Sequence, residues 1–165
     1  MKDILIRPAA RADAPAMAEI YNQAVARSTA TFDTEPESVE AREAWLDEHT
    51  APQHPVLVAV RDAQVIGWAS LSRYSSRCAY TATVEASAYI DERETGHGLG
   101  TALSAALLEA GRAGGVHAVL ARICTENTAS LAMSRKLGFF DVGVLREVGV
   151  KFGRSLDVMM LEKLV

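Results

Sequence analysis

The sequence contains few of the side chains that hold metals or form disulfides. It has only two cysteines, Cys78 and Cys124, which lie far apart and form no Cys-x-x-Cys pair. Its four histidines lack the close pairing on one element that zinc sites use. We therefore expect two free, reduced thiols and no metal ion.

Long hydrophobic runs are also missing. The short apolar stretch within residues 1–7 is broken by charged residues and is too brief for the core of a signal peptide. No segment approaches the roughly 20 apolar residues of a membrane-spanning helix. These absences predict a cytoplasmic protein that does not act in a membrane.

The sequence has no excess of positive charge. Its 17 Lys and Arg residues stand against 21 Asp and Glu, which gives a formal net charge of −4, and the basic residues are scattered along the chain. Neutralising the phosphates of a nucleic acid requires a concentrated basic surface. The charge pattern therefore argues against a nucleic-acid-binding protein.

The composition is typical of one globular domain. Of the 165 residues, 49% are hydrophobic and 23% are charged, values well away from those of disordered chains. A chain of this length buries about two-thirds of its unfolded surface, which suffices for one core and leaves no room for a second domain. We expect a single domain over residues 1–165.

Hydrophobic periodicity predicts alternating strands and helices, with an ordered loop at residues 26–36. The predicted strands are 4–7, 56–60, 65–71, 81–90, 116–124, 139–148 and 156–164, and the predicted helices are 13–25, 39–48, 101–113 and 128–137. Strands 56–60 and 65–71 are close enough to form an antiparallel hairpin. These elements predict an α/β (α+β) fold, with a mixed, mostly antiparallel sheet and helices on both faces.

A glycine-rich segment, residues 93–101, joins a predicted strand to a predicted helix. Glycines there allow several backbone N–H groups to converge on an anion, and the start of the helix adds a partial positive charge. The glycines at alternate positions fit neither the Rossmann nor the Walker spacing, so nicotinamide and nucleoside triphosphate cofactors lose their main support. Taken alone, the segment is either a phosphate-binding loop or a flexible turn.

Glu85 is an isolated acidic residue in a predicted strand of Thr, Ala, Val, Ser and Tyr. Burying a carboxylate there is costly unless it is paired, solvated or used in chemistry. The residue pattern leaves open both a carboxylate on an exposed face and a catalytic base.

Three segments, in order, resemble motifs of the GNAT superfamily of N-acetyltransferases. Residues 96–103, preceded by Tyr89-Ile90, resemble the acetyl-coenzyme A loop of that family. Residues 127–130 leading to 136–139 resemble its second signature, and residues 6–9 with Asp13 resemble its usual start. More narrowly, the chain resembles the phosphinothricin and methionine sulfoximine acetyltransferase branch at residues 31–36, 79–80, 84–85 and 151–153 and at Asp157.

The resemblance implies a GNAT fold that holds acetyl-coenzyme A between strand 81–90 and the next strand. The implied cofactor-binding residues are Ala88, Tyr89, Ile90, Thr95, Gly96, His97, Gly98, Leu99, Gly100, Thr101, Asn127 and Ser130. Thr95 departs from the family pattern, which usually has Arg or Gln at this position, so we expect weaker cofactor binding. Asn127 is also expected to cap the helix that follows it.

The resemblance implies Glu85 as the catalytic base. Many GNAT enzymes place a Tyr after the second signature, whereas the aligned residue here is Ser134. Its hydroxyl either donates a hydrogen bond to the sulfur of the cofactor or is merely a polar group on the exposed side of a short helix.

For the acceptor, the resemblance implies Phe32, Thr34, Tyr74 and Arg77. A guanidinium suits a bidentate grip on an α-carboxylate, although an exposed arginine without this role is the alternative for Arg77. Phe32 either closes over the acceptor or anchors its loop to the core. Lys151 and Asp157 recur in the branch without a role that the sequence assigns.

The implied function is transfer of acetyl to the α-amine of a small amino acid or analogue, such as phosphinothricin or methionine sulfoximine or sulfone, by a homodimer. One alternative acceptor is another amine, such as a polyamine, an aminoglycoside or a protein N-terminus, and acidic Asp33, Glu35 and Glu37 keep cationic acceptors open. Another alternative is a non-catalytic acyl-coenzyme A sensor, against which the presence of Glu85 argues.

Overall fold

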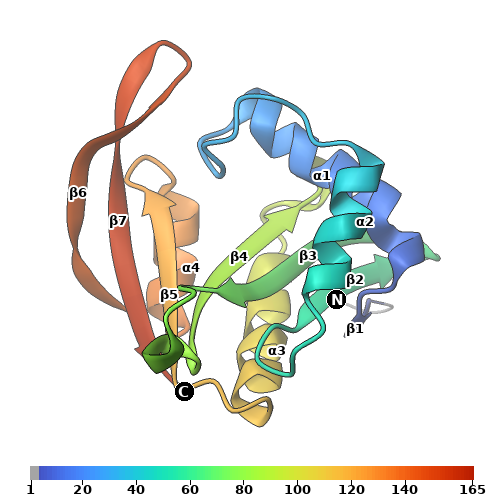
Figure 1. Cartoon of the computed structure of the whole chain (residues 1–165). Helices are drawn as coiled ribbons and strands as arrows, with labels where there is room; N and C mark the ends of the chain where they lie inside the picture. The colour runs from blue at the N-terminus through green and yellow to red at the C-terminus, as the bar shows by residue number, and fades with distance from the viewer. Residues whose placement is uncertain (1–3) are drawn as a thin grey trace.

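The computed structural model describes residues 4–165, and residues 1–3 of the expected domain lie outside the described part. Residues 4–165 contain one seven-stranded sheet with the strand order β1-β2-β3-β4-β5-β7-β6 (Figure 1). The strands are β1 Leu5–Pro8, β2 Val56–Arg61, β3 Gln64–Arg73, β4 Thr83–Ile90, β5 Ala118–Cys124, β6 Phe140–Lys151 and β7 Arg154–Leu164. The helices are α1 Ala14–Arg27, α2 Val39–Glu48, α3 Leu99–Ala113 and α4 Thr128–Lys136, with 3-10 turns η1 Arg11–Asp13, η2 Cys78–Tyr80 and η3 Glu92–Glu94.

The predicted fold class is confirmed, but the last two strands are longer than predicted. Strand β6 continues to Lys151, where it pairs with Arg154 of β7. A two-residue turn joins the strands, with φ of 53° at Phe152 and 73° at Gly153, the left-handed backbone that tight hairpins need. The predicted strands had ended at Val148 and begun again at Leu156. Strands β4 and β5 each begin slightly later than predicted.

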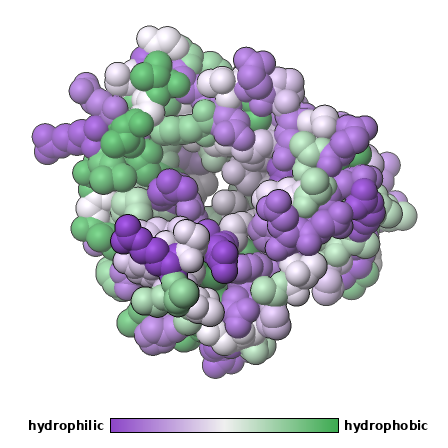
Figure 2. Space-filling view, viewed as in Figure 1, coloured by the Kyte–Doolittle hydropathy of each residue, from purple (hydrophilic) through white to green (hydrophobic). Residues whose placement is uncertain are grey.

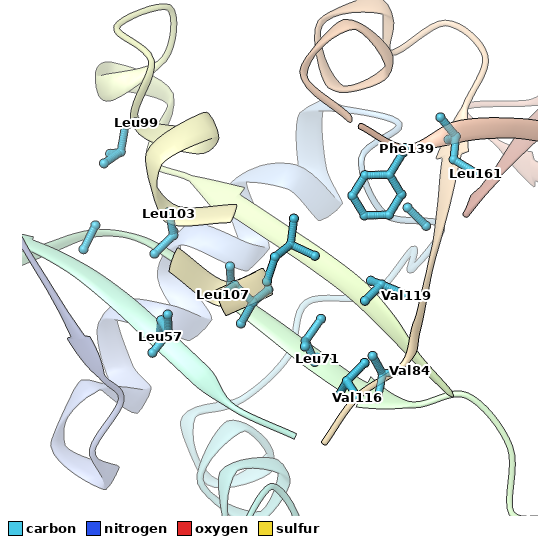
Figure 3. Packing of buried hydrophobic residues seen from close by; sticks show 14 of the residues in the cluster. Leu57, Leu71, Val84, Leu99, Leu103, Leu107, Val116, Val119, Phe139 and Leu161 are labelled. Carbon is cyan, nitrogen blue, oxygen red and sulfur yellow. The ribbon is translucent and has the colours of Figure 1, made fainter. Parts of the chain in front are cut away.

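The sheet separates two hydrophobic clusters. On one face, α3 and α4 cover the cluster that contains Leu71, Leu107 and Leu161 (Figure 3). On the other face, α1 and α2 pack around Trp68, whose indole N–H donates to the Met17 carbonyl at 3.0 Å. Because full burial of one such side chain stabilises a fold by roughly 1.5–3 kcal/mol, these two clusters fix the sheet between its helices.

Strand β4 presents different side chains to the two faces. Neighbours along a strand point to opposite sides, so Val84 and Ala86 join the cluster under α3, while Tyr89 joins the cluster under α1. Glu85 shares the parity of Tyr89. Its carboxylate therefore lies on the α1 side of the sheet.

Strands β4 and β5 form a parallel pair that diverges along its length. The ladder joins Thr83–Glu85 only to Ala118–Leu120, whereas β4 stays paired to β3 as far as Ile90. Figure 1 shows the two arrows separating beyond this short ladder. On its β5 side, the backbone of residues 86–90 therefore has no ladder partner. The divergence opens the sheet at its centre.

Candidate active site

Three adjacent cavities surround the opening between β4 and β5. The innermost is lined by residues 86–89 of β4, residues 121–124 of β5 and side chains of α4. A groove of about 510 Å³ runs from it over the start of α3, and a pocket of about 420 Å³ lies below residues 29–33. Ala30 and Tyr89 line all three. A hollow near the middle of the molecule is visible in Figure 2.

The glycine-rich loop forms one end of the groove. Gly96 and Gly98 have φ of 81° and 80°, a left-handed conformation that glycine adopts without steric cost. No atom lies within 4 Å of the Cβ positions that side chains would occupy at either glycine. Gly98 is the N-cap of α3, so the first N–H groups of that helix have no partner within the helix. The loop therefore offers open space and free donors to an anion.

Nearly all of the predicted cofactor residues line this groove. They are Ala88, Tyr89, Ile90, Thr95, Gly96, Gly98, Leu99, Gly100, Thr101, Asn127 and Ser130. His97 is exposed and does not line the groove. The binding role of each residue stays a prediction.

Acidic side chains on the groove are paired with arginines. Arg27 lies 2.9 Å from Glu92, and Arg61 forms a salt bridge with Glu94. Thr95 is exposed, and its hydroxyl donates to the Glu92 carbonyl at 3.0 Å. These pairs offset the negative charge that would otherwise oppose a phosphate.

The groove fits acetyl-coenzyme A by the chemistry of its two ends. Phosphates suit the free N–H groups at the start of α3. The unpaired backbone of residues 86–90 offers donors and acceptors to the amides of a pantetheine arm, as the edge of a sheet does to an added strand. The inner cavity shares Ser87, Tyr89 and Arg122 with the pocket that Glu85 lines.

Glu85 occupies the last position of the β4–β5 ladder and is held by an arginine of β5. Its carboxylate accepts hydrogen bonds from Arg122 Nε at 2.6 Å and from Arg122 Nη2 at 2.8 Å. The Glu85 side chain is 22% exposed and that of Arg122 is 59% exposed. The pair lies at the mouth of the pocket below residues 29–33, which we call the acceptor pocket. The hydrogen bond to Glu85 raises the pKa of the Arg122 guanidinium, and burial opposes that shift.

Arg122 was not predicted as a site residue. It lies 37 positions from Glu85, and the only sequence signal was a charged residue in an otherwise apolar strand. The pairing depends on the parallel register of β4 and β5, in which Glu85 lies opposite Leu120. No local pattern specifies that register.

Ser134 is buried at 5% exposure and lines the innermost cavity. The alternative that it lies on the exposed side of its helix is therefore wrong. The reason is that this side of α4 faces the inner cavity, which residues 121–124 of β5 also line. Asn127 caps α4 as predicted, because its Oδ1 accepts from the Ser130 N–H at 3.2 Å. Its contact with a cofactor stays a prediction.

The acceptor pocket is lined by only some of the predicted substrate residues. Phe32 lines it, together with Glu85. Thr34, Tyr74 and Arg77 are exposed and do not line it. Tyr74 instead packs edge-on against Tyr80, with ring centroids 5.3 Å apart. Binding of substrate by these three residues stays a prediction.

The loop above the pocket is fixed from below by buried polar groups. The Tyr21 hydroxyl donates to Asp33 Oδ2 at 2.6 Å and lies 2.8 Å from the Thr31 hydroxyl. Burial, followed by the bond to Asp33, raises the pKa of Tyr21. Lys151, only 3% exposed, donates to the carbonyls of Ser28 and Thr31 at 2.9 and 2.8 Å. Loop and hairpin therefore form one unit.

Asp157 stabilises the same hairpin at a bulge. Its Oδ1 accepts from the Glu147 N–H at 2.8 Å, where Glu147 has a φ of 52°. Lys151 and Asp157, which had no role from sequence, thus both shape the wall of the acceptor pocket.

Residues 4–165 contain neither a cluster of metal ligands nor a membrane-spanning helix. No group of three or more His, Cys, Asp or Glu in this range is placed to hold a metal ion. No helix of the same range is both long and apolar enough to cross a membrane. Both cysteines are free, with Cys78 exposed and Cys124 buried.

The chain is similar to known acetyltransferases over most of its length. Residues 3–140 match the acetyltransferase (GNAT) domain family. The L-methionine sulfoximine/L-methionine sulfone acetyltransferase of Pseudomonas aeruginosa is 39% identical over 95% of this chain and 92% of that protein. The phosphinothricin N-acetyltransferase of Streptomyces coelicolor is 35% identical over 98% of this chain and 96% of that protein. The acetyltransferase yncA of Salmonella typhimurium, solved with its cofactor acetyl-CoA, superposes with a TM-score of 0.95 at 34% identity, covering 99% of this chain and 94% of that one.

Proposed function

The chain belongs to the GNAT acetyltransferase family, and on that premise we propose that it transfers acetyl from acetyl-coenzyme A to the α-amine of a small amino acid. The leading acceptors are phosphinothricin, methionine sulfoximine and methionine sulfone, which the names of its relatives contain. The observation that carries the proposal is the position of Glu85. Its carboxylate lines the acceptor pocket at the point where β4 and β5 separate to form the inner cavity.

Acetyl-coenzyme A supplies the acetyl thioester when it is bound in the groove. Glu85 accepts a proton from the ammonium of the acceptor, because only a neutral amine attacks a carbonyl carbon. With acetyl-coenzyme A bound, the C–N bond would form as the C–S bond breaks, and the buried hydroxyl of Ser134 would donate a hydrogen bond to the departing thiolate, which takes up a proton to leave as free thiol. The start of α3 and the β4 backbone would hold the cofactor and orient it toward Glu85.

The experiment that tests the proposal is release of free thiol from acetyl-coenzyme A by the purified protein. The acceptor panel contains phosphinothricin, methionine sulfoximine, methionine sulfone, common amino acids, spermidine and an aminoglycoside. Saturable turnover of the first three, without turnover of the cations, supports the proposal. Turnover of only the cations contradicts the acceptor assignment.

Cationic acceptors fit this pocket less well than the sequence suggested. Of the three acidic residues that kept them open, only Asp33 lines the pocket. Glu35 is exposed elsewhere, and Glu37 pairs with the buried Arg42. The non-catalytic sensor remains the alternative if the protein binds cofactor and acetylates no amine in the panel.

We also propose that the protein is a cytoplasmic homodimer that pairs through β6. Strand β6 is an edge strand, and Figure 2 shows hydrophobic side chains gathered over the β6–β7 hairpin, at the upper left. Val142, Val148 and Val150 of β6 are 57%, 55% and 66% exposed. Long apolar edges invite pairing with another chain. Light scattering should therefore give twice the chain mass, and Val142→Lys with Val150→Lys should give monomers.

A further inference from the structure

We propose that Arg122 binds the α-carboxylate of the acceptor and that, in doing so, it exchanges its pair with Glu85 for a pair with the substrate. This inference rests on the proposed function and names the residue that selects the substrate class. It differs from the expectation that Arg77 holds the carboxylate.

The charges of the acceptor pocket point to this assignment. Among the described residues that line the pocket, Arg122 is the only cation, and Glu85 and Asp33 are the acidic residues. Arg77 is exposed on the segment that ends at η2 and does not line the pocket. A carboxylate that enters the pocket therefore meets one guanidinium, that of Arg122.

The contact between Glu85 and Arg122 matches the chemistry of an α-amino acid. The ammonium and the carboxylate of such a substrate are attached to the same carbon, so the groups that recognise them must also be neighbours. Glu85 and Arg122 touch at 2.6 and 2.8 Å. A zwitterion replaces their mutual pair with two new ones, ammonium to Glu85 and carboxylate to Arg122, without a change in net charge.

The geometry of Arg122 suits a carboxylate ligand. Its Nε and Nη2 already donate in parallel to the two oxygens of Glu85, which is the fork that guanidinium groups present to any carboxylate. Breaking the pair between Arg122 and Glu85 costs little free energy, because solvent screens a pair in which Arg122 is 59% exposed. Once Arg122 has moved to the substrate carboxylate, both oxygens of Glu85 are free to take the proton of the ammonium.

Selectivity follows from the same exchange. An amine without a carboxylate, such as a polyamine, cannot draw Arg122 away from Glu85, and the base stays occupied by the guanidinium. The pocket therefore favours free amino acids over their amides and over simple amines.

The test compares L-methionine sulfone with its carboxamide in the wild-type protein, in Arg122→Gln and in Arg77→Ala. We expect Arg122→Gln to lower kcat/KM for the acid by about 10- to 100-fold, the usual loss for a hydrogen-bonded charge pair, and to raise kcat/KM for the amide, because no guanidinium then occupies Glu85. Because each variant is compared with the wild type on both compounds, the different reactivities of the two amines cancel. Arg77→Ala should leave the acid-to-amide ratio unchanged.

Binding of the N-acetylated product, measured by calorimetry, gives a readout that does not depend on turnover. The product keeps the carboxylate and lacks the ammonium, so Arg122→Gln should weaken its binding and Arg77→Ala should not. Wild-type turnover with an unchanged acid-to-amide ratio in Arg122→Gln overturns this inference alone. If the wild-type protein acetylates neither compound, the proposed function and this inference fall together.

Discussion

The ring of Phe32 lies directly against Gly149, so closely that a Cβ on Gly149 would come within 2.1 Å of Phe32 Cε2. Gly149 belongs to β6, whereas Phe32 lies in the loop above the acceptor pocket. Phe32 is therefore both a wall of the pocket and an anchor of its loop. The contact anchors the loop to the β6–β7 hairpin, and closure of Phe32 over the acceptor stays a prediction.

Gly149→Ala should displace Phe32 and impair acceptor binding. Overpacking of this kind costs about 1–3 kcal/mol, so we expect the KM for the acceptor to rise about tenfold while the KM for acetyl-coenzyme A stays within twofold. Steady-state kinetics with each substrate varied measures both. The matched control is Gly143→Ala on the same strand, where nothing lies within 4 Å of the new Cβ. Equal KM values in the two variants would contradict this role for the contact.

Lys151→Met should destabilise the protein and loosen the acceptor loop. The buried ammonium of Lys151 donates to three backbone carbonyls, those of Ala24, Ser28 and Thr31, and buried acceptors left without donors cost about 1–3 kcal/mol. Urea unfolding should show a loss of that size, accompanied by a higher KM for the acceptor. Lys136→Met, at an exposed lysine, serves as control. Equal stability of the two variants would contradict the stabilising role of Lys151.

Thr95→Arg should strengthen cofactor binding. The new guanidinium would extend into the groove from the glycine-rich loop, where the Thr95 hydroxyl now donates to the Glu92 carbonyl. We expect the Kd for coenzyme A to fall about threefold to tenfold at low salt and the gain to shrink at high salt. Calorimetry at two salt concentrations measures this. Ala113→Arg, at the other end of α3, adds the same charge and should leave the Kd unchanged; an equal gain there would show a general charge effect instead.

Asp91 should make stability depend on pH in the acid range. Hydrogen bonds from Arg93 lower the pKa of this carboxyl, which is only 4% exposed, from 3.8 to about 2. Because the folded-state pKa is lower than the unfolded one, the stabilisation is complete above the unfolded value and is lost as the pH falls from about 4 to 2.

Asp91→Asn removes this contribution. At pH 7 the variant should be less stable by roughly 1–2 kcal/mol, a range that allows for solvent screening of the exposed Arg93. Near pH 2 the difference should disappear. Urea unfolding from pH 2 to 7 measures it, and a constant difference across that range would mean that the carboxylate charge is not the cause.

Local sequence signals predicted the helices and strands because their causes are local. Asn127 caps α4 through its own side chain, and the glycines at 96 and 98 take the left-handed backbone that ends one element and starts the next. The hairpin end of β6 and β7 was mispredicted because its cause is not local. Gly149, a residue that usually breaks strands, is needed there to admit Phe32 from a distant segment.

The parts of the site that sequence did not predict depend on long-range packing. Arg122 reaches Glu85 only because β4 and β5 pair in parallel over three residues and then separate. Ser134 is buried only because α4 packs it into the inner cavity. His97 lies between two groove-lining glycines but is exposed and does not line the groove itself, so its binding role stays a prediction.

The most direct test of the account is Glu85→Gln, which keeps the shape of the side chain and removes its ability to accept a proton. We expect kcat for methionine sulfone to fall by about 100- to 10,000-fold, the usual contribution of a positioned base, while the Kd for acetyl-coenzyme A, measured by calorimetry, stays within twofold of the wild-type value. Glu109→Gln, on the exposed face of α3, should behave as wild type. A Glu85→Gln protein that turns over at the wild-type rate would contradict the assignment of Glu85 as the base.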